Sequence, residues 1–272
     1  MASPPTLSNL VVDATPDRDL EWRLRLALQV AAAYGGDLLA VCSAWPGGIT
    51  LSEVITHTPL GSHAKEQELR NSIASAKLVF DRLTKDSAVN TEWCASIADP
   101  AVALHDHALL ADLVILGAPD AAGEAHVDPV ELAGRSGAPV LRLGASAATA
   151  PFANVLIGWK ARREARCALR AALPILHQAE RIVLVGVGDE AAVAALSAVR
   201  DYLAGCGLQV EVMSVEDDAG APASMLAAIA RREGCQLIVA GARSRGRWKE
   251  RIFGGVTQEL LAARDLNWLL AN

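Results

Sequence analysis

Short apolar runs alternate along the chain with longer segments whose aliphatic residues recur at helical spacing. Segments 20–34 and 63–85 place such residues three and four positions apart, which predicts helices, and Asp99-Pro100 is typical of a helix start. The apolar runs of the first half predict five strands, at 9–12, 37–42, 91–97, 111–117 and 139–143. Because runs such as 111–117 are almost continuously apolar, we expect strands covered on both faces, as in a parallel sheet.

The second half repeats this order. ADLVILGA at 111–118 corresponds to CQLIVAGA at 235–242, which indicates a tandem repeat of about 130 residues. The repeat predicts domains 1–145 and 146–272, joined by the linker Gly144–Pro151. The fold class expected is α/β, with two tandem, doubly wound, mostly parallel five-stranded sheets. The predicted elements are strands at 154–158, 181–187, 208–215, 236–241 and 267–270, and helices at 162–176, 190–204, 222–232 and 257–263. Pro174 is expected to bend or end its helix.

Composition and charge argue against a membrane-spanning, a secreted or a nucleic-acid-binding protein. The chain is 52% hydrophobic, yet no apolar run approaches the roughly 18–20 residues of a membrane helix. The start lacks a secretory signal, and five cysteines without a CxxC pair indicate reduced thiols, so we expect a cytoplasmic location. The net charge of −6 argues against nucleic-acid binding. Residues 1–150 carry 10 basic and 18 acidic residues (net −8), and residues 151–272 carry 15 and 13 (net +2).

The most informative segment is GARSRGRWKERIFGGVT at 241–257. It leaves an apolar strand, passes five basic residues and enters a predicted helix through two glycines. Free N–H groups at a helix start bind anions, and arginines add donors for phosphate oxygens. The segment therefore predicts a site for a phosphate-bearing ligand, to which Lys160, Arg162 and Arg163 would add charge. The alternative interpretation is a solvated basic loop.

These segments, together with Val12-Asp13 and PFANVLIGWKARREARCALRAALPIL at 151–176, resemble the universal stress protein family in its tandem form. The resemblance implies the adenine nucleotide alpha hydrolase-like fold and, in ATP-binding members, Gly-x2-Gly-x9-Gly-Ser/Thr after the fourth strand with an acidic residue after the first. The motif falls on Gly241, Ser244, Gly254 and Gly255, and departs from the family at Ser244 and Gly255. Lys160 stands where the second half should carry the acidic residue.

The first half keeps the acidic residue, Asp13, but its segment 117–128 is acidic and lacks the glycine spacing. Acidic side chains there would repel phosphate. We therefore expect a non-catalytic stress-response or signalling protein whose second half binds ATP, another adenine nucleotide or another anion, with Mg²⁺ only as the nucleotide's companion. The expected ligand contacts are Asp13, Lys160, Val187, Gly241, Arg243, Ser244, Arg245, Arg247, Gly254, Gly255, Val256 and Thr257.

Three alternatives stay open. The repeats could form a ligand-free scaffold for interaction, or the chain could hydrolyse ATP slowly, or GVGDEA at 186–191 could bind a dinucleotide. The spacing of His105 and His107 on a predicted helix points them to different faces, so no metal site is expected. The resemblance also implies an internal pseudo-dimer through the final strands, 139–143 and 267–270, with surface left for pairing two chains. No membrane partner is expected.

Overall fold

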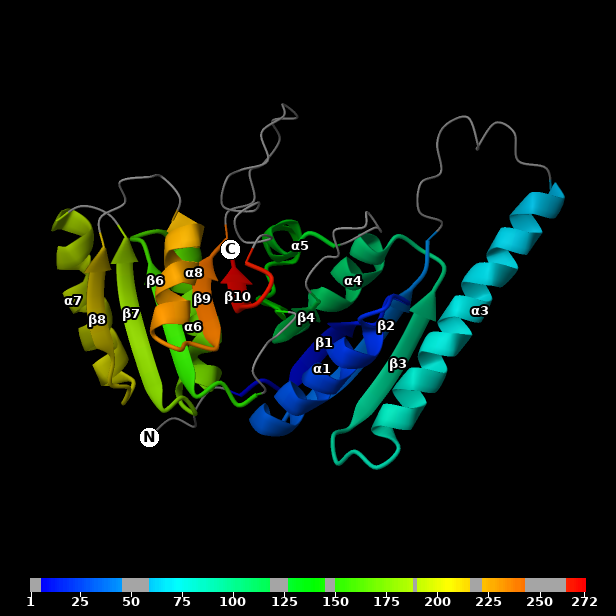
Figure 1. The fold of residues 1–272 in the computed structure, drawn as a ribbon, viewed down its shortest axis with the longest axis horizontal. Coiled ribbons are helices and arrows are strands. Elements are labelled where there is room, and N and C mark those ends of the chain that lie inside the picture. The colour runs from blue at the N-terminus through cyan, green and yellow to red at the C-terminus, as the bar shows by residue number, and fades with distance from the viewer. Residues whose placement is uncertain are drawn as a thin grey trace.

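The computed structural model of the protein describes residues 6–45, 59–117, 127–144, 150–187, 190–215, 222–242 and 263–272, and Figure 1 shows their arrangement. One sheet of ten strands runs through the molecule, in the order β3-β2-β1-β4-β5-β10-β9-β6-β7-β8. Its strands are β1 (Asn9–Asp13), β2 (Asp37–Ser43), β3 (Thr91–Ser96), β4 (Leu113–Leu116), β5 (Val140–Arg142), β6 (Asn154–Trp159), β7 (Arg181–Val187), β8 (Glu211–Val215), β9 (Leu237–Gly241) and β10 (Asn267–Ala271).

The two halves of the sheet have the same strand order. Within each half the neighbouring strands are parallel, and the halves meet where β5 pairs antiparallel with β10, with Arg142 opposite Trp268. This pairing confirms the predicted contact between the final strands. The two predicted sheets are therefore joined edge to edge into one. The division at residue 145 stays a prediction.

Helices cover both faces of the sheet, as a doubly wound fold requires. One face carries α1 (Leu20–Tyr34), α3 (Pro59–Thr84), α6 (Arg163–Leu176) and α7 (Glu190–Gly205), and its buried residues form a core that runs through both halves. The other face carries α4 (Pro100–Ala108), α5 (Pro129–Ser136) and α8 (Pro222–Arg232), with two separate cores. Figure 1 shows α3 beside the edge strand β3.

Local signals in the sequence explain where several helices begin and end. α1 ends at Gly35, whose φ of 72° is left-handed and suits glycine. α4 begins after Asp99, whose carboxylate accepts hydrogen bonds from the N–H groups of Ala101 and Val102. α6 includes Pro174 and continues to Leu176, so this proline lies inside the helix, near its end. The predicted helix 257–263 lies almost entirely outside the described residues.

The amino ends of the strands repeat one contact in both halves. The Asp112 carboxylate accepts hydrogen bonds from the N–H groups of Ser8 and Asn9, each at 2.9 Å. The side-chain amide oxygen of Gln236, Oε1, accepts from the backbone N–H groups of Ala153 and Asn154, at 2.6 and 3.2 Å. Because Asp112 and Gln236 occupy matching positions of the repeat, the duplication extends to single hydrogen bonds.

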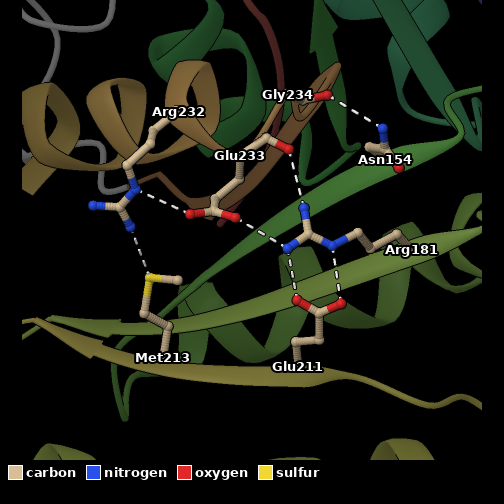
Figure 2. Close-up of polar contacts among 7 residues, drawn as sticks. All are labelled: Asn154, Arg181, Glu211, Met213, Arg232, Glu233 and Gly234. Atoms are coloured by element: carbon tan, nitrogen blue, oxygen red, sulfur yellow. Dashed lines mark hydrogen bonds and ion pairs between the residues drawn. The ribbon is translucent and has the colours of Figure 1, made fainter.

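A network of ion pairs also lies at this amino edge (Figure 2). The Arg181 guanidinium donates to both carboxylate oxygens of Glu211, at 2.9 and 2.6 Å. It also donates to the carboxylate and the backbone carbonyl of Glu233, both at 3.0 Å. Arg232 donates to the same Glu233 carboxylate. The network links β7 to β8 and to the end of α8. It does not involve the carboxyl edge of the sheet.

No helix among the residues described here combines the length and the hydrophobicity that crossing a membrane requires.

Candidate functional site

In each half the strand order reverses between two neighbouring strands, and the crevice beyond their carboxyl ends is where doubly wound folds bind ligands. In the first half this switch point lies between β1 and β4, and in the second between β6 and β9. The residues after β1, β4, β6 and β9 are therefore the ones to compare.

In the second half, the start of α6 lies against the end of β9. A Cβ atom on Gly241 would lie 2.5 Å from the backbone nitrogen of Ala165, too close for any side chain. Gly241 therefore allows the first turn of α6 to approach the switch point. The N-cap of this helix is Arg162, which is extended (φ −139°, ψ 157°) and makes no side-chain cap. The helix thus begins at the ligand edge without the usual polar cap.

Five exposed cations surround this helix start and continue along α6. They form no ion pair with any other described residue, whereas exposed arginines elsewhere, such as Arg25 and Arg70, pair with a glutamate one turn away. Positive side chains near a helix N-terminus oppose the helix dipole, so α6 gains no stability from those in its first turn. The five are Lys160, Arg162, Arg163, Arg166 and Arg170.

The first half fills the equivalent place with one of its own side chains. Arg23 of α1 is only 3% exposed, and its guanidinium donates to the carbonyl oxygens of Asp13 and Thr15 and to the carboxylate of Asp17. A Cβ atom on Gly117, just after β4, would lie 3.0 Å from Arg23 Nη1. Arg23 therefore lies across the ends of β1 and β4, at the switch point.

Comparisons with known proteins agree with this architecture. The model of the universal stress protein family matches residues 130–264. The chain belongs to the universal stress protein family. A universal stress protein from Archaeoglobus fulgidus DSM 4304 has the same fold over 96% of this chain and 98% of its own, with 14% identity and a TM-score of 0.75. A putative universal stress protein from Pseudomonas aeruginosa UCBPP-PA14 matches over 97% of this chain and 93% of its own, with 16% identity and a TM-score of 0.56. Comparison with curated proteins gives no match.

The register of the sheet changes one predicted match between the two halves, that of Lys160 with Asp13. Leu10 pairs with Leu113 in the first half, and Val155 pairs with the matching residue, Leu237, in the second. Counting forward, Asp13 corresponds to Gly158, and Lys160 corresponds to Thr15. The prediction that Lys160 takes the place of Asp13 was therefore wrong. The prediction aligned the ends of β1 and β6 by sequence similarity. The backbone pairing of the strands instead matches Asp13 with Gly158, two residues before Lys160.

Asp13 itself is turned toward its own loop. Its carboxylate accepts hydrogen bonds from the backbone N–H of Thr15 at 2.9 Å and from the hydroxyl of Thr15 at 2.6 Å. Its carbonyl oxygen accepts from Arg23. The structure thus brings Asp13 together with Arg23, a residue that the motif comparison missed. One signal was available, because Arg23 lies on the apolar stripe of α1, between Leu20 and Ala27.

The structure describes only some of the predicted ligand contacts. It places Gly241 at the second switch point and Lys160 just after β6, and Val187 ends β7. The predicted contacts Arg243, Ser244, Arg245, Arg247, Gly254, Gly255, Val256 and Thr257 lie outside the described residues, and so does most of segment 117–128.

Other candidate features have structural roles where they are described. A Cβ atom on Gly186 would lie 2.7 Å from Leu196 of α7, so this glycine of the GVGDEA segment allows close helix packing; Gly188 and Asp189 lie outside the described residues. Trp159 is half-buried and packs against the core. Within the described ranges, no cluster of three metal-binding side chains occurs. Burial raises the pKa of the Cys42 thiol to about 12, which keeps it protonated.

Proposed function

We propose that this universal stress protein acts as a non-catalytic, cytoplasmic binding protein of stress response or signalling, and that its second half binds a phosphate-bearing ligand. ATP or another adenine nucleotide is the ligand class that we favour. Family membership supports the stress-protein role. The observation that carries the ligand proposal is the start of α6, where a helix N-terminus without a side-chain cap meets cations that form no ion pair with the residues described.

The geometry at Gly241 supports anion binding. The first turn of α6 reaches the end of β9 because Gly241 has no side chain. Backbone N–H groups of a helix's first turn have no partner within the helix and carry a partial positive charge. A phosphate placed beyond β6 and β9 would accept hydrogen bonds from these groups.

The exposed cations support the same ligand. Arg163 and Arg166 lie one turn apart at the start of α6 and form no ion pair within the described part of the chain. Guanidinium groups donate to phosphate oxygens in pairs, and such charge-assisted bonds are about twice as strong as neutral ones. A polyphosphate would relieve the mutual repulsion of these cations and of the helix dipole.

The side chains near this site favour binding over catalysis. Among the described residues, the titratable groups that the structure brings to the second switch point are three cations, Lys160, Arg162 and Arg163, and one carboxylate, Glu164, which already has an interaction partner. Arginine stays protonated at neutral pH and cannot act as a general base. We therefore propose that the bound nucleotide is held without turnover, and that any Mg²⁺ arrives with the nucleotide.

Calorimetry at low salt with ATP and with AMP tests this proposal. We expect Arg163→Gln with Arg166→Gln to weaken ATP binding by about tenfold or more, since each lost charge-assisted bond contributes about 1.5–3 kcal/mol. The control, Arg70→Gln with Arg82→Gln on α3, removes the same charge from the first half and should leave the affinity nearly unchanged. Absence of heat with either nucleotide would instead favour a ligand-free interaction scaffold.

A second pair of variants tests the basic segment 243–251. Arg245→Glu with Arg247→Glu should abolish ATP binding and leave the melting temperature nearly unchanged, because the reversed charges repel phosphate. An unchanged affinity would mean that this segment is only a solvated basic loop.

A further inference from the structure

Arg23 is a buried cation in an unusual place. It lies in the second turn of α1, on the stripe that packs against the sheet, and only 3% of it is exposed. Burying a guanidinium costs several kcal/mol unless hydrogen bonds and opposite charge compensate. The contacts of Arg23 therefore indicate which kind of chemical group this part of the first half can bind.

Those contacts come from the loop that follows β1. Three guanidinium nitrogens donate: Nε to the Asp13 carbonyl at 2.6 Å, Nη2 to the Thr15 carbonyl at 2.9 Å, and Nη1 to the Asp17 carboxylate at 2.9 Å. Every acceptor is an oxygen, and one is ionised. The first-half switch point is therefore lined by groups that attract a cation and would repel phosphate.

The charge balance supports this description. Burial by itself lowers the pKa of Arg23, but the negative charges of Asp13 and Asp17 outweigh that effect and raise it. The buried Arg142 of β5 differs, because burial there lowers its pKa to about 10. The first-half loop thus compensates its arginine with carboxylates.

Gly117 makes room for the guanidinium. Its Cα faces Arg23, with Nη1 3.0 Å and Cδ 3.3 Å from the position of a missing Cβ. The matching residue in the second half is Gly241, which faces the backbone of α6 instead. Equivalent glycines therefore admit a cationic side chain in one half and a helix N-terminus in the other.

We infer that Arg23 is the resident ligand of the first half: its guanidinium occupies the switch point, which has become a cation-accepting pocket closed to phosphate. One phosphate-bearing ligand would then bind per chain. That count rests on the function proposed for the second half, whereas the occupancy of the first half does not.

Chemical rescue of Arg23→Ala tests the pocket directly. The variant loses its internal cation and should melt at a lower temperature, and millimolar methylguanidinium chloride should raise that temperature by on the order of a few degrees through binding to the folded state. The same salt should not stabilise the wild type or Arg25→Ala, an exposed arginine of the same helix. Absence of rescue in a folded Arg23→Ala variant, against potassium chloride at equal ionic strength, would overturn the inference.

Hydrogen exchange of the wild-type protein gives a second test that needs no folded variant. Exchange of peptides covering 10–24 and 113–117 should be the same with and without millimolar ATP. Slower exchange there would overturn the inference. Failure of the proposed function would appear elsewhere, as unchanged exchange at 155–170 and 237–242, so the two outcomes are separable.

Discussion

Gly117 directly follows β4 and Gly241 is the last residue of β9. The two positions are equivalent in the repeat, and at each the missing side chain makes room for a different neighbour. At Gly117 the neighbour is the end of the Arg23 side chain, and its nearest atom lies 3.0 Å from the position of an added Cβ. At Gly241 it is the backbone of α6, which can move only if the helix moves. A single methyl group should therefore be tolerated far less well at Gly241.

We expect Gly241→Ala to lower the free energy of unfolding by about 1–3 kcal/mol, because a Cβ 2.5 Å from the Ala165 nitrogen forces α6 away from β9. Denaturant titration measures this change. Gly205→Ala is the control: it lies at the end of α7 with nothing within 4 Å of an added Cβ, and should stabilise by about 0.5–1 kcal/mol. Equal effects at both positions would contradict the packing argument.

The charged side chains at the two ends of the strands differ in their contacts. The amino edge is tied by Arg181, which joins β7, β8 and the end of α8 through Glu211 and Glu233 (Figure 2). The carboxyl edge presents the start of α6 and its exposed cations. Ion pairs stabilise the fold at the amino edge, whereas the five exposed cations of the carboxyl edge form no ion pair within the described part of the chain.

The amino-edge network predicts a dependence of stability on pH. Hydrogen bonds from Arg181 lower the pKa values of Glu211 and Glu233 below their ordinary 4.5. A lowered pKa adds stability that is present above pH 4.5 and is lost as pH falls through the folded-state values. The melting temperature of Arg181→Gln should thus lie below that of the wild type at pH 7, and the difference should shrink below pH 4.5.

Arg200→Gln provides the comparison for that variant. Arg200 is exposed and contacts only the neighbouring Asp201 among the described ion pairs, so its loss should change the melting temperature little at either pH. A pH-independent difference between Arg181→Gln and the wild type would show that Arg181 acts through packing and not through its carboxylate partners.

For the whole molecule, the decisive feature is the core that crosses between the halves. On the face covered by α1 and α6, buried residues form one cluster from Leu7 to Ala271. Hydrogen bonds also cross the junction, since the Phe152 N–H donates to the Tyr34 hydroxyl and the Gln178 amide donates to the Ala33 carbonyl. Two repeats that share a core are expected to unfold together.

We expect Leu269→Ala, in the fully buried part of β10, to lower the free energy of unfolding by about 2–5 kcal/mol. Hydrogen exchange under denaturant should then show both halves losing protection together. Leu78→Ala, at a residue that is 71% exposed on α3, should change stability little. Loss of protection in the second half alone would contradict a shared cooperative core.

The sequence determined the elements and their order, because helix and strand periodicity, caps and glycine stops act between neighbours in the chain. It placed α1 at residues 20–34, β7 at 181–187 and α8 at 222–232, and it identified the family and the pairing of the final strands. The elements are local features, and the pairing of the final strands was implied by the resemblance to the family.

Which residues meet at the two switch points depends on long-range contacts in the folded chain. Arg23 and Gly117 lie 94 residues apart in the sequence, and only the order β1-β4 brings them together. Backbone hydrogen bonds likewise fixed the register that matches Asp13 with Gly158. The acceptors of Arg23 lie within ten residues of it, and its place on the apolar stripe of α1 was a local signal. Its position opposite Gly117 is a long-range feature, set by strand order and packing, which no local pattern encodes.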